Sequence, residues 1–213
     1  MSRRYDCADP AVRAKALADA AGAVRAGELV VLPTDTVYGI GCDAVRASAV
    51  DALLAAKGRG REMPAPILIG SLSALDSLAT GVGPDGTGLI ERFWPGALTL
   101  VFAAAPHVPA GLGDARGTVA VRMPRSELAL DLLAAAGPMA VSSANRSGSP
   151  PARSMADAYA QLGSSVSVYL DDGPSPVGEP SSIVDLSGEV PRLLRAGAIP
   201  VDDLREVCDI ATG

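Results

Sequence analysis

The sequence predicts an α/β (α+β) fold in which helices flank an open, twisted sheet of mixed parallel and antiparallel strands. Hydrophobic residues make up 48% of the 213 residues and charged residues 20%, which suits a globular chain with a substantial core. Short apolar runs alternate with segments of helical periodicity. Because this alternation lacks the regular crossovers of a purely parallel sheet, we expect a mixed sheet. The prediction is a single domain over residues 1–213, with its core at about 10–200.

The first predicted helix is recognised by both of its ends. Asp9 is a suitable N-cap, Pro10 fits the first helical position, and Gly27 ends the apolar-periodic segment. A buried strand then runs over Leu29–Leu32 and ends at Pro33. We expect the next stretch, "TDTVYGIG", to be a loop rich in hydroxyl groups.

Further elements follow the same logic. A second helix is predicted over residues 48–57, with Ser48 as its cap and Gly58 as its stop. A third helix, "RSELALDLLAAAG", has Ser126 as its cap and Gly137 as its stop. Six apolar runs are predicted strands: "PAPILIG", "GALTLVFAA", "GTVAVRMP", "PMAVSSAN", "SVSVYLDDG" and "SSIVDL". The segments "TGVGPDGTG", "RSGSPPARS" and "DDGPSPVGEP" are predicted loops of the same domain.

The composition argues against several classes of protein. A net charge of −6 and an aromatic content of 3% disfavour a general nucleic-acid binder, which neutralises phosphates and stacks bases. Three cysteines at unrelated spacings form neither a disulfide framework nor a metal motif, and they favour a reducing cytoplasm. With neither a signal peptide nor an apolar run of about 18 residues, we expect a soluble, cytoplasmic protein without a membrane segment.

The common catalytic motifs are also missing from the sequence. It contains no GxxxxGKS phosphate loop, no GxGxxG and no GxSxG. The single histidine, His107, lies in a proline-rich loop and is not expected to be catalytic. Without His pairs or Cys clusters, we expect no metal held by the protein itself.

Three positive charges in five residues follow the second predicted helix, in "KGRGR". The chain has two lysines against sixteen arginines, so Lys57 stands out at the head of this cluster. A compact ammonium beside the guanidinium of Arg59 suits a polyphosphate. Basic residues at a helix end also complement its dipole, and the spacing alone favours neither interpretation.

Polar side chains gather where predicted strands end, as in many α/β ligand sites. Ser and Asn are also ordinary turn residues, and a strand arginine such as Arg122 pairs either with a ligand anion or with an acidic residue of the chain. These clustered polar residues are Thr34, Thr36 and Tyr38, then Ser142, Ser143 and Asn145, and further along Ser181, Ser182 and Arg195.

Six stretches together resemble the YrdC-like domain of the threonylcarbamoyl-AMP synthase family, over roughly residues 10–200. They are "LPTDTVYGIGCDA", "KGRGREMP", "FWPGALTLVF", "TVAVRMP", "SSANRSG" and "SSIVDLSG" with "LLRAGAI". The resemblance implies a reaction of L-threonine, bicarbonate and ATP that gives L-threonylcarbamoyladenylate and pyrophosphate. It also implies Mg²⁺ on the triphosphate, a downstream tRNA-modifying transferase complex as partner, and room for a weak tRNA contact.

The resemblance assigns roles residue by residue. The implied catalytic residues are Lys57, Arg59, Ser143 and Asn145. The implied ATP contacts are Lys57, Arg59, Met63, Thr118, Asn145, Arg195 and one of Arg153 and Ser154. The implied threonine contacts are Thr36, Arg122, Ser143 and one of Ser181 and Ser182.

Two positions depart from the family pattern. Many members have Asn where this chain has Met63, and a His where this chain has Ile69 and Gly70. The length matches the short, single-domain form of the family. The alternatives are an RNA-binding module with a basic cleft, a carbamoyl-transfer domain like that of hydrogenase maturation, and a regulator that retains the pocket without catalysis. The enzyme hypothesis requires the "KGRGR" turn and the strand exit at Ser143 to face each other across a common hollow.

Overall fold

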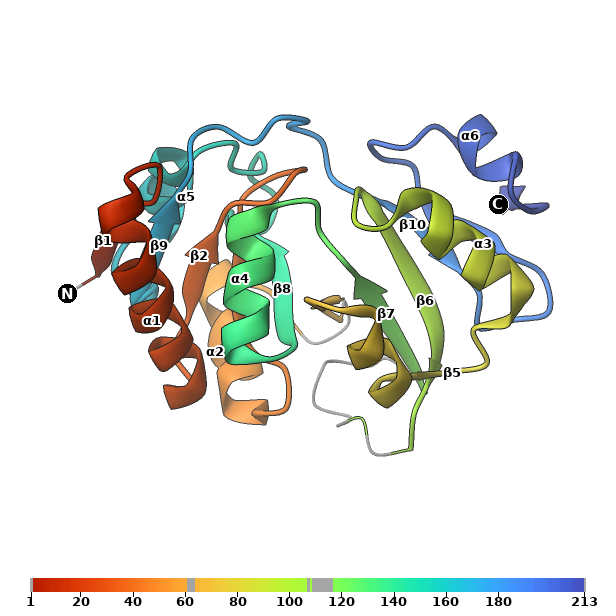
Figure 1. Cartoon of the computed structure of the whole chain (residues 1–213), viewed down its shortest axis with the longest axis horizontal. Coiled ribbons are helices and arrows are strands. Elements are labelled where there is room, and N and C mark those ends of the chain that lie inside the picture. Colours follow the sequence, from red (N-terminus) through yellow and green to blue (C-terminus); the bar gives the residue numbers. More distant parts are fainter. Residues whose placement is uncertain (1, 61–63, 107, 109–116, 213) are drawn as a thin grey trace.

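The structure, a computed structural model, describes residues 2–60, 64–106, 108 and 117–212. Figure 1 shows how its elements are arranged. The strands are β1 (Arg3–Asp6), β2 (Val30–Leu32), β3 (Gly39–Asp43), β4 (Ile67–Leu68), β5 (Ala79–Thr80), β6 (Leu98–Ala104), β7 (Thr118–Arg122), β8 (Met139–Ser143), β9 (Val168–Asp171), β10 (Ser182–Asp185), β11 (Arg192–Arg195) and β12 (Ala211–Thr212). The α-helices are α1 (Pro10–Ala26), α2 (Ala47–Lys57), α3 (Gly83–Phe93), α4 (Glu127–Ala136), α5 (Met155–Leu162) and α6 (Val201–Arg205), and 3₁₀ turns lie at Leu72–Ser77 and Gly163–Ser165.

The strands of the described residues join in one 12-stranded sheet. Its order is β1-β9-β2-β3-β8-β4-β7-β6-β10-β11-β12, and β5 pairs with β6. Parallel pairs such as β2 with β9 stand beside antiparallel pairs such as β3 with β8. The predicted mixed sheet is therefore confirmed, and it crosses the whole molecule from β1 on the left to β10 on the right (Figure 1).

The helix ends predicted from capping residues are confirmed for α1 and α4. Asp9 accepts a hydrogen bond from the N–H of Ala11, and Gly27 adopts a left-handed conformation with φ of 84°. Ser126 likewise accepts a hydrogen bond from the N–H of Ala129, and Gly137 ends α4. Each of the six predicted strands contains a strand of the structure. The residues that end these helices and strands lie next to them in the sequence, so the sequence alone predicts where they are.

The predicted start of α2 is wrong by about one residue. The helix begins at Ala47, and Arg46 rather than Ser48 occupies the N-cap position. The turn before it is held by Asp43, whose carboxylate accepts a hydrogen bond of 3.0 Å from the N–H of Val45. The side chain of the preceding strand end, and not a serine cap, therefore sets where this helix begins.

The stretch "TDTVYGIG" is only partly a loop, because β3 begins at Gly39. A Cβ at Gly39 would lie 2.6 Å from Cγ1 of Val141, and one at Gly41 would lie 2.8 Å from Cε of Met139. Both glycines therefore make room for side chains of the neighbouring strand β8. The glycines that suggested a turn serve close packing inside the sheet instead.

The segment "TGVGPDGTG" is also not a loop throughout, because α3 begins within it. Pro84 occupies the first helical turn, where its missing N–H costs nothing. A Cβ at Gly86 would lie 3.1 Å from Cε1 of Phe102, so the glycine lets α3 approach β6 closely. The sequence reading also missed β1, α5, α6 and the strands β11 and β12.

Helices cover both faces of the sheet. The apolar residues of α1 and α4 pack on one face, in a cluster with Leu32, Leu68 and Val141, and Figure 1 shows these two helices side by side. The residues of α2, α3 and α5 belong to a second cluster with Ile40 and Phe102. No helix in the described ranges is long and apolar enough to cross a bilayer.

The first of these faces continues onto β7 as a polar surface. Residues paired across neighbouring strands point to the same side of a sheet, and Leu68 on β4 pairs with Arg122 on β7. Side chains alternate along a strand, so Thr118 and Arg122 share this face about 13 Å apart. The sheet therefore passes from an apolar surface under α4 to a polar one, where several predicted site residues lie.

Candidate functional site

The end of α2 and the exit of β8 are in direct contact. Gly58, with φ of 64°, ends α2 immediately after Lys57. The Nζ of Lys57 donates hydrogen bonds to the main-chain oxygen of Ser143 and, at 2.7 Å, to that of Asn145. The N–H of Ser147 returns a bond of 2.9 Å to the oxygen of Lys57. The fold thus brings together two stretches that lie 86 residues apart in sequence.

The expected open hollow between these stretches is not found at Lys57. The residue is only 3% exposed, and two carbonyl oxygens occupy its amine. Lys57 therefore holds the strand exit in place instead of projecting into open space. Arg59 follows two residues later, and its Nη1 is 3.5 Å from Oγ of Ser142.

Burial also changes the ionisation of Lys57. Loss of solvent, together with the nearby charge of Arg59, lowers the pKa of Lys57 to about 8. The ion pairs formed between described residues do not include Lys57. The amine is still mostly protonated at neutral pH, so it adds positive potential at the end of β8.

Asn145 presents a buried acceptor that the described residues leave unsatisfied. Its side-chain nitrogen donates to the oxygens of Arg146 and Ser149, at 2.9 and 2.7 Å. Its Oδ1 is buried without a hydrogen-bond partner within the described part of the chain. Since buried polar atoms are nearly always paired, this oxygen is suited to accept a bond from a ligand hydroxyl or amino group.

A second group of residues centres on Arg122 at the end of β7. Its guanidinium donates to the oxygen of Gly96 at 2.8 Å, to Oγ1 of Thr36 at 2.8 Å and to Oδ1 of Asp35 at 2.6 Å. Burial lowers the pKa of Arg122, while the charge of Asp35 opposes that change. The arginine therefore has an internal acidic partner, and two of its five N–H groups lie outside the bonds made within the described residues.

Ser181 and Arg195 lie next to this group. Arg195 donates to the main-chain oxygen and to Oγ of Ser181, both at 3.0 Å, and that hydroxyl is 2.8 Å from Oγ1 of Thr99. Partial loss of solvent around the Arg195 guanidinium, together with the nearby charge of Arg122, lowers its pKa. Ser182 is turned away, because its hydroxyl bridges the oxygen and N–H of Ile199 at 2.7 and 3.1 Å.

A short link connects the two groups. The N–H of Ala144 donates to the oxygen of Tyr38 at 2.8 Å, beside the pairing of Gly39 with Ser143. Thr36 stands two residues before Tyr38 in the same loop. The Arg122 group and the Lys57 group therefore meet at one end of β3 and β8, which is the arrangement that a ligand with several anionic parts requires.

Comparison with known proteins places the chain among relatives. The family model Sua5_yciO_yrdC, described as "Telomere recombination", matches residues 22–197. The chain belongs to this family. A Mycobacterium tuberculosis protein, provisionally named a threonylcarbamoyl-AMP synthase, is 52% identical over 211 residues, covering 99% of this chain and 97% of its own. The threonylcarbamoyl-AMP synthase of Pyrococcus abyssi is 39% identical over 189 residues, which cover 88% of this chain and 56% of that protein.

The structure of Pyrococcus abyssi Sua5 complexed with L-threonine has the same fold. It matches with a TM-score of 0.89 at 35% sequence identity, over 99% of this chain and 62% of that one. The YrdC-like fold expected from the sequence is thereby confirmed. Within the Sua5–YciO–YrdC family, this chain spans a little under two thirds of that longer structure.

Arg153 and Ser154, the two alternatives for one predicted nucleotide contact, differ in their local contacts. The hydroxyl of Ser154 caps α5, where it accepts from the N–H of Asp157. Arg153 is exposed, and its side chain packs over Gly178, where a Cβ would lie 3.1 Å from Nε. Thr118 begins β7 on the face that carries Arg122. Met63 and His107 lie outside the described residues.

The departure at Gly70 has a structural cause. A Cβ there would lie 3.1 Å from Cβ of Leu133 and 3.3 Å from the main-chain nitrogen of Ala134, both on α4. Ile69 is fully buried in the core. A histidine at position 70 would force α4 away from the sheet, so this chain does not offer that family contact.

Sequence reasoning overlooked Asp35, Thr99 and Gly96. Asp35 stands between Thr34 and Thr36, just after the apolar strand ends at Pro33, and a charged residue at that place was the available signal. Gly96 contributes a main-chain oxygen, which sequence cannot reveal. Within the described ranges, no group of three or more His, Cys, Asp or Glu side chains is arranged to hold a metal ion.

Proposed function

We propose that this chain is an L-threonylcarbamoyladenylate synthase. It would use L-threonine, bicarbonate and ATP to form threonylcarbamoyl-AMP and pyrophosphate, and it would thus act as a nucleotidyltransferase. The observation that carries the proposal is an excess of positive charge at one end of the sheet. Lys57, Arg122 and Arg195 gather there with Asp35 as their one carboxylate partner among the described residues, in a chain of net charge −6.

The Arg122 group is suited to the amino acid. The two remaining N–H groups of Arg122 can bind a carboxylate, and Thr36 and Ser181 offer hydroxyls beside them. Ser143 lies at the junction with the Lys57 group and is assigned to the same substrate. Ser181 is preferred over Ser182, because its hydroxyl lies among the side chains of Thr99 and Arg195, whereas the hydroxyl of Ser182 is bonded to the main chain of Ile199. The structure of Pyrococcus abyssi Sua5 complexed with L-threonine supports this choice of ligand.

The Lys57 group is suited to the nucleotide. Arg59 is assigned to the phosphates. Lys57, whose amine is hydrogen-bonded to two main-chain oxygens, adds positive potential beside them. The free Oδ1 of Asn145 can accept a hydrogen bond from the nucleotide. Further ATP contacts are assigned to Thr118, Arg153 and Arg195, whereas the position of Met63 is assigned by family resemblance alone.

The chemistry requires alignment and charge neutralisation. Threonine nitrogen and bicarbonate form a carbamate with loss of water, and a carbamate oxygen then attacks the α-phosphorus of ATP. The bond from that phosphorus to the bridging oxygen breaks, and pyrophosphate leaves with the electron pair. Cations that meet the developing charge on pyrophosphate lower this barrier, and no covalent nucleophile is needed.

Mg²⁺ enters this proposal with ATP as part of the substrate. The described residues of the site are cations, hydroxyls and an amide, and Asp35 is committed to Arg122. Such a set does not suit a divalent cation, so phosphate oxygens and water would hold it. We further propose a cytoplasmic enzyme whose product passes to a tRNA-modifying transferase complex, with at most a weak contact to tRNA itself.

The test is an amino-acid panel with purified protein. ATP, bicarbonate and each amino acid are supplied separately, pyrophosphate release is followed, and the adenylate product is identified by mass spectrometry. We expect release that depends on both threonine and bicarbonate. Pyrophosphate release that is independent of threonine would reject the proposal. So would a protein that does not turn over ATP and whose RNA affinity rises steeply as the salt concentration falls.

A further inference from the structure

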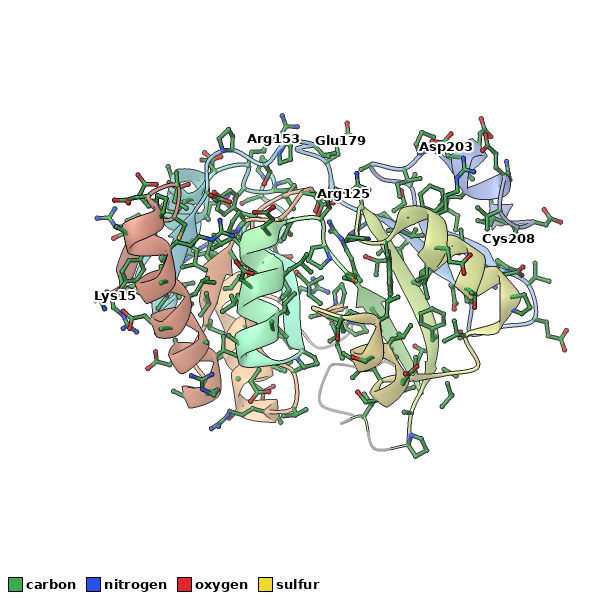
Figure 2. The ribbon with its side chains drawn as sticks, in the orientation of Figure 1. Lys15, Arg125, Arg153, Glu179, Asp203 and Cys208 are labelled. Atoms are coloured by element: carbon green, nitrogen blue, oxygen red, sulfur yellow. The ribbon has the colours of Figure 1, made fainter. Side chains whose placement is uncertain are left out.

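Asp35 joins three separate segments next to the proposed threonine site. Its Oδ1 accepts hydrogen bonds of 2.6 Å from Nη2 of Arg122 and 2.9 Å from the N–H of Arg125. Its main-chain oxygen accepts a hydrogen bond of 3.1 Å from the N–H of Val177, in the loop between β9 and β10. Figure 2 shows Arg125 between β7 and α4, under the loop that carries Glu179.

These contacts fix the direction in which Arg122 points. Its planar guanidinium is held by three acceptors from two parts of the chain: Gly96, and the neighbouring residues Asp35 and Thr36. Three differently directed bonds leave little freedom for the plane to turn, so the two remaining N–H groups face a fixed direction. The side chains of Arg122 and Asp35 are only 7% and 8% exposed, so solvent has little access to this ion pair.

We propose that Asp35 is a positioning residue that orients Arg122 toward the carboxylate of the amino-acid substrate. This inference rests on the proposed function, because that function supplies the carboxylate. Asp35 acts through Arg122 and does not itself need to touch the substrate. Its loss would therefore weaken amino-acid binding far more than nucleotide binding.

The bonding pattern separates position from charge. Both side-chain bonds of Asp35 go to the same oxygen, Oδ1. Asp35→Asn keeps a carbonyl-type oxygen at that point but removes the charge. Asp35→Glu keeps the charge but moves the carboxylate by one methylene, and the cavity of about 250 Å³ that Asp35 lines gives this methylene room. Asp35→Ala removes both.

The experiment measures L-threonine and Mg·ATP binding separately by isothermal titration calorimetry, with melting temperature as the folding check. Asp35→Ala is expected to weaken threonine binding by about tenfold or more and to change ATP binding less than twofold. Asp35→Glu is expected to behave like Asp35→Ala. Asp35→Asn is expected to stay within about threefold of the wild type. Asp171→Ala, which removes a partner of the buried Tyr38 hydroxyl, is the matched control and should not split the two affinities.

Several outcomes would overturn the inference. Folded Asp35→Ala with wild-type threonine affinity would do so, as would equal losses of threonine and ATP binding, which indicate a structural role. If Asp35→Ala does not fold, Asp35→Glu binding normally while Asp35→Asn fails would show that charge, and not position, is what matters. A wild-type protein that does not bind threonine would instead reject the proposed function.

Discussion

Nucleotide binding should draw about 0.7 proton onto the protein at pH 8.5, through Lys57. Burial and the charge of Arg59 lower the pKa of Lys57 to about 8, so only about a quarter of the free protein carries this proton at pH 8.5. A bound triphosphate adds negative charge near the amine and raises its pKa toward the ordinary 10.5, which leaves the amine almost fully protonated. At pH 7 about nine tenths of the free protein is already protonated, so the uptake should fall to about 0.1 proton.

The measurement is calorimetric titration of ATP in two buffers of different ionisation enthalpy, at pH 7 and at pH 8.5. The difference in apparent enthalpy between the buffers gives the number of protons taken up. ATP phosphates are fully ionised at pH 8.5, so they do not contribute. The uptake should disappear in Lys57→Met. An uptake that is equal at both pH values, or that persists in Lys57→Met, would refute the placement of phosphates beside Lys57.

Three further experiments test the site. Arg59→Ala should lower threonine-dependent pyrophosphate release by about ten- to a hundredfold at an unchanged melting temperature, and normal turnover would remove Arg59 from the site. Ser181→Ala should weaken threonine binding, whereas Ser182→Ala should cost about 1–3 kcal/mol of stability by denaturant titration; the reverse pattern would contradict the assignment. Gly197→Ala should lower both stability and threonine affinity, since its Cβ would lie 2.6 Å from the main chain of Ser181. Gly188→Ala, where nothing lies within 4 Å, is the control, and equal behaviour of the two would be a contrary result.

Features set by neighbours in sequence were predictable. The ends of α1 and α4 follow from Asp9, Gly27 and Ser126, whose side chains or backbones act within four residues. The gathering of polar groups at strand ends was also predictable, because the ends of neighbouring strands meet at one edge of a sheet. Thr36 and Ser143 reach the same end of the sheet for this reason.

Features set by distant partners were not predictable in the same way. Gly39 and Gly86 look like turn residues in sequence, but each makes room for a side chain on a neighbouring strand, Val141 and Phe102 respectively. Asp35 and Arg122 are 87 residues apart, and nothing local marks them as a pair. The carbonyl oxygens that accept hydrogen bonds from Lys57 belong to the main chain. Every residue has such an oxygen, so no residue type in the sequence could predict this contact.

The sequence left open which member of two adjacent pairs contacts a ligand, and the hydrogen bonds inside the fold distinguish the members of each pair. Ser181 and Ser182 are chemically identical, but side chains of neighbouring residues on an extended chain point to opposite sides. The hydroxyl of Ser182 is hydrogen-bonded to Ile199, whereas that of Ser181 accepts a hydrogen bond from Arg195. Ser154 likewise caps α5 and leaves Arg153 as the exposed cation. A ligand that binds either serine must replace bonds that the serine hydroxyl already makes. For Ser181 these bonds go to the side chains of Thr99 and Arg195, next to the Arg122 group, whereas for Ser182 they go to the main chain of Ile199. Ser181 and the exposed Arg153 are therefore the better candidates.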